Sequence, residues 1–229
     1  MVALAVGVLL AVAVALGSGV RLAVALGADA VGFVFAPSSR QMAAQKVFDI
    51  TRRLPPEILT VGVFRDEHPS RVVEIVQRSG VKAAQLHGHE SPEDVAIVAK
   101  NVHWVIKAVT AGSVDARRAD LFAADMIMVD AVAPGAGQIF DWNLLSEMPL
   151  VNKLILAGGL TAQNVAAGIQ SAQPWGVDVS TGVEVSPGKK DALLMKRFID
   201  AVRAAPQTME RTHLQEGDNG PYDWSDENR

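Results

Sequence analysis

The stretch Leu154–Glu184 decides the fold, and it reads LILAGGLTAQNVAAGIQSAQPWGVDVSTGVE. Two apolar runs within it, Leu154–Ala157 and Val177–Val179, are typical of buried strands. Each run is followed by small residues, which let backbone N–H groups approach an anion closely. In a (β/α)₈ barrel the loops after strands seven and eight form the usual phosphate site. We therefore predict a phosphate site here, and the alternative is that the small residues only turn the chain. The predicted phosphate-binding residues are Gly158, Gly159, Ser180, Thr181 and Gly182.

Apolar runs of the same kind recur along the chain, spaced by roughly one βα unit of 22–30 residues. They are continuous, as parallel strands buried on both faces should be, and amphipathic helical patterns separate them. An eighth strand must come from residues 1–16, followed by a helix around Gly19–Leu26. We predict a single (β/α)₈ barrel over residues 1–204; an open doubly wound sheet would call for a G-x-G-x-x-G opening, which is missing. The other predicted strands are Ala30–Phe35, Leu59–Phe64, Ala83–Leu86, Trp104–Val109 and Met126–Asp130.

Three helices are predicted from specific signals, two from residues typical of a helix N-terminus and one from an apolar stripe. Pro69 suits the first turn of a helix over Ser70–Ser79. Ser91 is a candidate N-cap, followed by a proline and two acids that favour the helix N-terminus. An apolar stripe predicts a last helix over Lys189–Ala204.

The composition of the chain disfavours several classes of function. The 229 residues carry a net charge of −4, which disfavours a general nucleic-acid binder. The chain has no cysteine, so disulfides and thiolate metal sites are ruled out. The histidines are scattered without a metal-ligand spacing, and we expect neither a metal nor a cofactor. The expected partner is a small phosphorylated molecule bound by a cytoplasmic monomer or homodimer, with neither nucleic acid nor membrane involved.

Both ends of the chain are atypical. Residues 1–17 contain no charged side chain, and we interpret them as an apolar lead-in plus a buried first strand. A membrane or export segment is the alternative, although the run is short for a span and lacks a preceding positive charge. Residues 205–229 are polar and poor in aliphatic side chains, which predicts a disordered tail.

Catalytic groups in a barrel sit where strands end, so the polar residues at those positions are the site candidates. Arg40 suits a bidentate pair with a carboxylate, or is a solvated loop residue. His87 closes the fourth strand after Gln85, and His89 is expected to be exposed. Asp130 follows four apolar residues and needs a partner there, which also fits a general acid. Lys107 is a substrate contact or a salt-bridge residue, and Asp178 is a pocket residue or the partner of Lys107.

Several segments together resemble phosphoribosylanthranilate isomerases, over residues 20–204 and in the right order. The combination of QLHG with FDW and GVDVS-x-GVE is specific. The matching segments are GADAVGFVF with PSSR (Gly27–Arg40), VGVF (Val61–Phe64), QLHG (Gln85–Gly88), VIKA (Val105–Ala108), MVDA (Met128–Ala131), G-x-G-x-x-FDW (Gly135–Trp142), LAGGL-x-x-x-NV (Leu156–Val165) and GVDVSTGVE with PGKKD (Gly176–Asp191).

The resemblance implies a single barrel without metal or cofactor that performs an Amadori rearrangement in tryptophan biosynthesis. The substrate is N-(5-phosphoribosyl)anthranilate and the product 1-(o-carboxyphenylamino)-1-deoxyribulose 5-phosphate. The resemblance also implies that Asp130 is the general acid and that Arg40 binds the anthranilate carboxylate. It places His87 and Asp178 in the substrate pocket.

The sequence departs from the family pattern in two places. The family's G-G-T-G loop reads Pro134-Gly135-Ala136-Gly137, so a hydroxyl is lost. The family's K-[IV]-C-G, whose cysteine is the general base, corresponds to a segment near Leu10–Leu16 without any titratable side chain. Three accounts stay open: an N-terminal sequence that is not the natural one, through a misplaced start or a frame error; another base, with Asp178 as the candidate; or a catalytically impaired barrel that binds its ligand without turnover.

Overall fold

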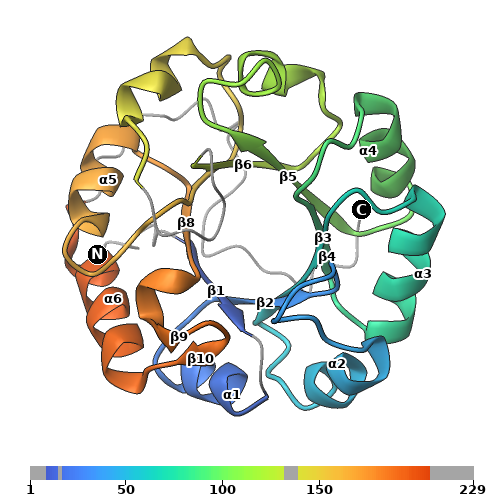
Figure 1. Cartoon of the computed structure of the whole chain (residues 1–229), viewed down its shortest axis with the longest axis horizontal. Helices are drawn as coiled ribbons and strands as arrows, with labels where there is room; N and C mark the ends of the chain where they lie inside the picture. Colours follow the sequence, from blue (N-terminus) through green and yellow to red (C-terminus); the bar gives the residue numbers. More distant parts are fainter. Residues whose placement is uncertain (1–8, 15–16, 132–138, 207–229) are drawn as a thin grey trace, which may run out of the picture.

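Eight parallel strands close into a barrel in the computed structural model, which describes residues 9–14, 17–131 and 139–206. The strands follow one another around the barrel in chain order, and β8 closes it against β1 (Figure 1). This arrangement confirms the predicted (β/α)₈ fold. The strands are β1 (Leu9–Val14), β2 (Ala30–Val34), β3 (Leu59–Phe64), β4 (Ala83–Leu86), β5 (Trp104–Thr110), β6 (Met126–Asp130), β7 (Leu154–Leu156) and β8 (Gly176–Val179).

Helices cover the outside of the barrel, and 3₁₀ segments take their place after β5 and β6. Among the described residues, no helix has the length and apolar character that a membrane crossing requires. The helices are α1 (Gly17–Ala25), α2 (Ala44–Thr51), α3 (Pro69–Ser79), α4 (Pro92–Ala99), α5 (Val165–Ala172) and α6 (Ala192–Ala204), and the 3₁₀ segments are η1 (Ala116–Leu121), η2 (Trp142–Glu147) and η3 (Thr181–Val183).

The predicted cap of α4 is confirmed. The Ser91 hydroxyl accepts a hydrogen bond from the Asp94 N–H at 3.1 Å, and the Asp94 carboxylate accepts one from the Ser91 N–H at 3.2 Å. This reciprocal arrangement is a capping box, which satisfies two amides that the helix itself leaves unpaired.

The predicted start of the last helix is wrong by three residues. Lys189–Lys190 form β10, which pairs antiparallel with β9 (Glu184–Ser186). The helix begins at Ala192, because the Asp191 carboxylate accepts the Leu194 N–H at 2.8 Å and caps it. The apolar stripe predicts the helix itself correctly. It does not reveal that the first two predicted residues belong to a short hairpin.

The core has two layers, one inside the barrel and one between the strands and the helices. Side chains such as Leu59, Ile106 and Met128 fill the interior, whereas Val47, Val72 and Phe198 pack helices onto the outside. At the N-terminal ends of the strands, the Lys153 ammonium lies 5.5 Å from the Trp104 ring centroid and 5.2 Å from that of Trp175. This end of the barrel is therefore packed, which leaves the other end for a site.

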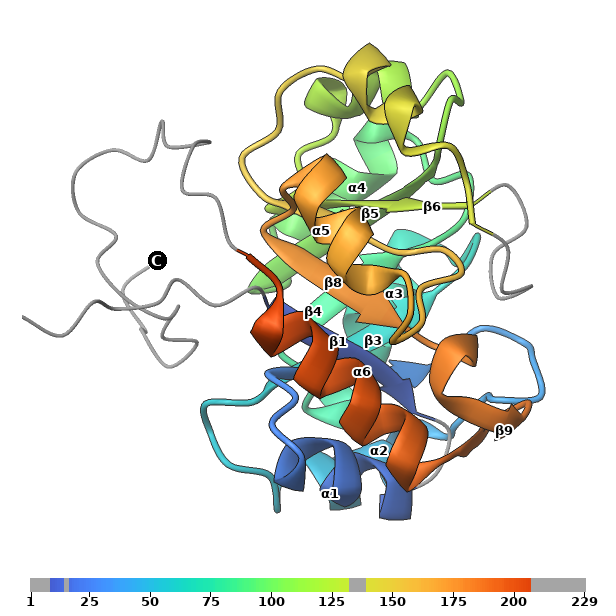
Figure 2. The same cartoon turned by 90° about the vertical axis from the view of Figure 1, so that its left-hand side faces the viewer.

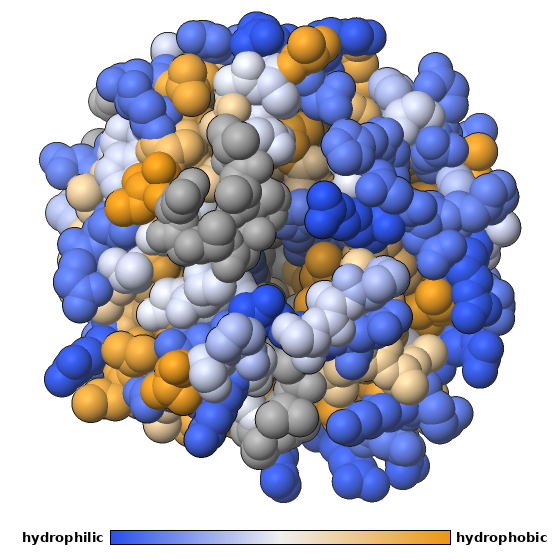
Figure 3. Space-filling model, viewed as in Figure 1, coloured by the Kyte–Doolittle hydropathy of each residue, from blue (hydrophilic) through white to orange (hydrophobic). Residues whose placement is uncertain are grey.

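The strands all point to the same end of the barrel, where the β9–β10 hairpin lies (Figure 2). Hydrophilic side chains predominate on this face (Figure 3).

The first predicted strand lies at Leu9–Val14. The lead-in of residues 1–8 and the tail residues 207–229 fall outside the described part of the chain. The predictions for those segments stay predictions.

Candidate active site

Asp130 is the last residue of β6, and its carboxylate is nearly buried. Oδ1 accepts a hydrogen bond from the Ala131 N–H at 2.7 Å. Oδ2 lies 3.2 Å from Nε2 of His87, at the end of neighbouring β4. The Ala131 N–H thus supplies one of the partners that a buried carboxylate requires, and Asp130 lies beside an imidazole at the C-terminal end of its strand.

Gln85 sets the orientation of His87. Its amide nitrogen lies 2.7 Å from His87 Nδ1 and also donates to Met128 Sδ at 3.4 Å. An amide nitrogen only donates, so Nδ1 accepts and the ring proton sits on Nε2, on the side of Asp130. Nε2 is buried, and its N–H is not aligned for a hydrogen bond to Asp130 despite the short distance. Among the described residues this N–H therefore has no hydrogen-bond partner, although it lies next to the carboxylate.

Asp178 lies on β8, with its side chain in the interior of the barrel. It lines a cavity of about 20 Å³ together with Gln85 and apolar side chains, and it is partly exposed there. Burial raises the pKa of the Asp178 carboxyl to about 7, and the charge of Asp130 adds to the effect, while Lys190 and His87 oppose it. Asp178 is therefore a carboxyl group that exchanges its proton near neutral pH.

The two predicted phosphate loops touch each other. Gly158 and Gly159 both have positive φ, at 82° and 62°, a conformation that favours glycine. The Asn164 side chain fixes this turn, because it donates to Gly159 O at 2.9 Å and accepts from the Thr161 N–H at 2.8 Å. A Cβ at Gly182 would overlap the Leu160 carbonyl oxygen, so the second loop packs directly against the first.

The phosphate loops also adjoin the acid. A Cβ at Gly158 would come within 2.9 Å of Asp130 Oδ1 and 2.7 Å of the Ala131 nitrogen. Glycine at this position therefore allows the turn after β7 to pack against the carboxylate. Ser180 precedes η3, and its carbonyl accepts a hydrogen bond from Lys190 at 2.8 Å.

Arg40 lies in the loop after β2 and reaches the same rim, but its guanidinium already has a partner. Glu184 accepts hydrogen bonds from Arg40 Nε at 3.2 Å and from Nη2 at 2.7 Å. The carboxylate that Arg40 pairs with is Glu184 of the protein itself, so Arg40 is not a solvated loop residue, and its contact with a substrate carboxylate stays a prediction. The second cation on Glu184 is Lys190, whose ammonium lies 3.0 Å from Oε1.

The predicted pairing of Lys107 with Asp178 is wrong. Lys107 lies in the middle of β5, and its ammonium is 2.8 Å from Glu90 and from the Gly88 carbonyl oxygen. Glu90 in turn accepts the N–H groups of Asp66 and Gly88 at 3.0 Å. This buried pair tightens the turn after His87 and does not face the pocket. His89 is exposed, as predicted.

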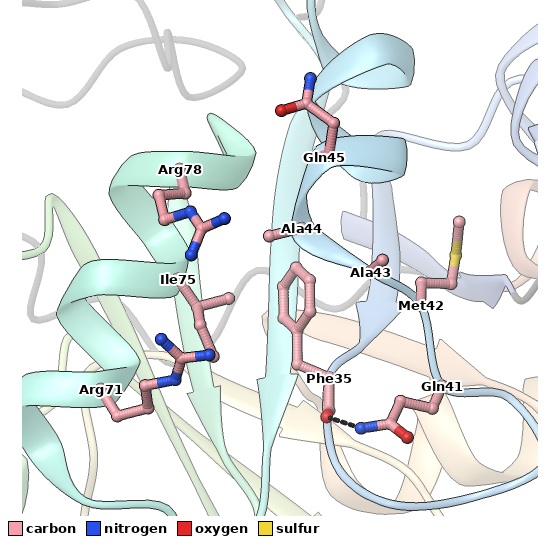
Figure 4. A pocket seen from close by; sticks show the side chains of 9 residues that line it. All are labelled: Phe35, Gln41, Met42, Ala43, Ala44, Gln45, Arg71, Ile75 and Arg78. Carbon is pink, nitrogen blue, oxygen red and sulfur yellow. Dashed lines mark hydrogen bonds between the residues drawn. The ribbon is translucent and has the colours of Figure 1, made fainter.

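A larger cavity of about 310 Å³ lies outside the barrel, between α2 and α3 (Figure 4). Phe35 and Ile75 form its apolar wall, and Arg71 and Arg78 extend toward it from α3. Both arginines are paired with Glu74. None of the predicted site residues lines this cavity, so we place the site at the barrel mouth despite its smaller volume.

The residues that the sequence analysis missed are Glu184, Lys190, Glu90 and Asn164. All lie within or beside segments that carry the family resemblance, but no role followed from their position alone. Within the described ranges, no three His, Asp or Glu side chains cluster as metal ligands would. The altered loop Pro134–Gly137 falls between residues 132 and 138, outside the described residues.

Comparison with known proteins agrees with this geometry. Residues 11–201 match the family model of N-(5'phosphoribosyl)anthranilate (PRA) isomerase. An N-(5'-phosphoribosyl)anthranilate isomerase from Desulforudis audaxviator is 44% identical over 192 residues, covering 81% of this chain and 92% of the relative. The crystal structure of phosphoribosyl anthranilate isomerase from Thermotoga maritima is 34% identical, with a TM-score of 0.77 over 85% of this chain and 98% of that one.

A further crystal structure of a phosphoribosyl anthranilate isomerase contains reduced 1-(o-carboxyphenylamino)-1-deoxyribulose 5-phosphate. It is also 34% identical, with a TM-score of 0.74 over 85% of this chain and 98% of that one. The fold, the order of the motifs and these relatives agree. The chain belongs to the phosphoribosylanthranilate isomerase family.

Proposed function

We propose that the chain converts N-(5-phosphoribosyl)anthranilate to 1-(o-carboxyphenylamino)-1-deoxyribulose 5-phosphate in tryptophan biosynthesis. The observation that carries this proposal is the position of Asp130, which lies beside His87 on one side and against the phosphate loop at Gly158 on the other. A substrate with its phosphate held by the loops after β7 and β8 would place its sugar carbons over this carboxyl group. The relative that binds a reduced product supports the ligand class.

In this mechanism Asp130 acts as the general acid. It donates its proton to the furanose ring oxygen as the bond from that oxygen to C1′ breaks, and the anthranilate nitrogen forms an iminium with C1′. Removal of the C2′ proton then gives an enolamine, which tautomerises to the ketone. The Nε2–H group of His87 is placed to hydrogen-bond the sugar hydroxyl that develops next to Asp130.

We assign the base to Asp178. The chain has no cysteine and no titratable side chain in β1, whereas Asp178 is the register partner of Ala11 on that strand. Its pKa of about 7 allows it to accept a proton at neutral pH. Asp178 would therefore supply, from the strand that pairs with β1, the base that β1 itself lacks.

The remaining roles follow the same geometry. Gly158, Gly159, Ser180, Thr181 and Gly182 hold the phosphate, and Arg40 binds the anthranilate carboxylate. We propose a cytoplasmic enzyme with a small phosphorylated substrate, acting as a monomer or homodimer.

The test is the loss of anthranilate fluorescence when purified protein is added to N-(5-phosphoribosyl)anthranilate. Wild type should turn the substrate over, and Asp130→Asn should not, while both bind the reduced product. Binding without turnover by wild type would instead support a catalytically impaired barrel, which the missing cysteine favours as the second candidate.

A further inference from the structure

We propose that Glu184 is a positioning residue that presents the Arg40 guanidinium to the carboxylate of the aryl substrate. The inference rests on the proposed function, since it concerns the carboxylate of that same ligand. It assigns a role to the G-V-E and P-G-K-K segments, which carry the family resemblance without a function of their own.

The hydrogen bonds leave one edge of the guanidinium for a ligand. Glu184 binds Nε at 3.2 Å and Nη2 at 2.7 Å, so it occupies the side-on edge. A guanidinium has five N–H groups, and the end-on edge formed by Nη1 and the second N–H of Nη2 remains. Among the described residues, Nη1 has no hydrogen-bond partner. A second carboxylate can bind this edge in the same bidentate manner.

Burial holds Glu184 in place. Its side chain is 4% exposed, compared with 19% for Arg40, so the glutamate lies behind and the arginine faces outward. Burial by itself would raise the pKa of Glu184, but hydrogen bonds from Arg40 and Lys190 lower it below its usual value, so the group stays ionised. A fixed anion behind a long flexible side chain removes most of the conformers that would carry the guanidinium away from the pocket.

Lys190 anchors Glu184 from the other side. Its ammonium, 3% exposed, lies 3.0 Å from Glu184 Oε1 and donates to the Ser180 carbonyl oxygen at 2.8 Å. The backbone fixes the pair as well, because Lys190 and Glu184 are opposite residues of the β9–β10 hairpin. The carboxylate-binding arginine is thereby tied to the loop proposed to hold the phosphate, which fixes the distance between the two anionic ends of the ligand.

The charge of the cluster fits this role. Glu184 is shared by Arg40 and Lys190, and the charge of Asp178 also acts on Lys190. Glu184 is therefore not the partner of Arg40 alone, and a ligand carboxylate on the end-on edge pairs with the guanidinium. A neutral ring lacking the carboxylate would gain nothing from the arrangement, so the cluster determines specificity.

The experiment measures binding and does not depend on turnover. Calorimetry compares reduced 1-(o-carboxyphenylamino)-1-deoxyribulose 5-phosphate with its counterpart that lacks the ring carboxylate. Glu184→Gln keeps the size of the side chain and removes the charge, and Glu184→Asp keeps the charge. Glu147→Gln is the matched control, because Glu147 is half exposed and pairs with Arg117 on the surface.

We expect Glu184→Gln to weaken binding of the carboxylated ligand about tenfold, as loss of a charge-assisted contact does, and that of its counterpart less than twofold. Glu184→Asp should recover part of the loss, and the control should match wild type. Equal weakening of both ligands would show a purely structural role and overturn the proposal. Tighter binding of the carboxylated ligand would show that Glu184 competes with it, which also overturns the proposal. If wild type binds neither ligand, the proposed function itself fails and the proposal with it, whereas binding without turnover leaves the role of Glu184 intact.

Discussion

Replacement of Asp178 by asparagine should stabilise the protein at alkaline pH and remove its activity. In the folded protein the pKa of Asp178 is raised from 3.8 to about 7, chiefly by burial. The folded state therefore holds its proton more tightly than the unfolded state does. Stability conferred by the protonated group is present at low pH and is lost as pH rises from about 4 to about 7.

The size of the effect follows from the same shift. One pKa unit corresponds to about 1.4 kcal/mol, so the ionised carboxylate lowers the free energy of unfolding by about 4 kcal/mol at pH 8. At pH 5 the folded protein keeps its proton, and the corresponding cost is below about 2 kcal/mol. The gain of Asp178→Asn over wild type should thus grow by about 2.5 kcal/mol between pH 5 and pH 8.

Urea unfolding followed by circular dichroism at several pH values measures this difference. Asp200→Asn is the control, since Asp200 is exposed on α6 and pairs with Lys196. The reasoning is refuted if the gain of Asp178→Asn is the same at both pH values, because its carboxyl group would then titrate alike in the folded and unfolded states. Loss of turnover together with the gain in stability would identify Asp178 as a catalytic group whose burial lowers the stability of the protein.

Three further substitutions test other parts of the site. Asp130→Asn should lower kcat by about 10²–10⁴-fold, as loss of a general acid does, while calorimetry shows the reduced product still bound. Gly158→Ala should lower both kcat/KM and the free energy of unfolding, because a Cβ there meets Asp130 at a strained backbone position. The loss of unfolding free energy should be about 1–3 kcal/mol. Gly27→Ala is the control: its φ is also positive but the space around it is open, so it should lower stability and leave kcat/KM unchanged. Lys107→Met should cost about 3–5 kcal/mol in urea unfolding, since Glu90 is left buried without its cation, and adding Glu90→Gln should recover part of it.

The fold could be predicted because its signals are local and repeated. Continuous apolar runs, such as Leu59–Phe64 and Met126–Asp130, coincide with observed strands, since burial on both faces leaves no room for polar residues. The Ser91 cap was predictable for the same reason, as its partners lie within three residues. The start of α6 was not, because the pairing of β9 with β10 competes with the helix and leaves no mark on the apolar stripe.

The sequence allowed several residues of the site to be predicted, but not the residues with which they form ion pairs. Strand ends placed Asp130 and His87 on the same rim, and the structure brings them to 3.2 Å. The partners of Lys107 and Arg40 were out of reach, because each contact joins residues far apart in the sequence through a loop whose path depends on tertiary packing. Glu90 and Glu184 look like ordinary loop acids until that packing is known.

The pH dependence of kcat/KM for N-(5-phosphoribosyl)anthranilate tests the central claim most directly, that this barrel isomerises its substrate with Asp130 as acid and Asp178 as base. The wild-type profile should show a transition with a midpoint of about 7, where Asp178 titrates, and Asp178→Asn should abolish that transition together with most of the rate. An unchanged rate and profile in Asp178→Asn, or the absence of turnover by a wild-type protein that binds the reduced product, would contradict the account.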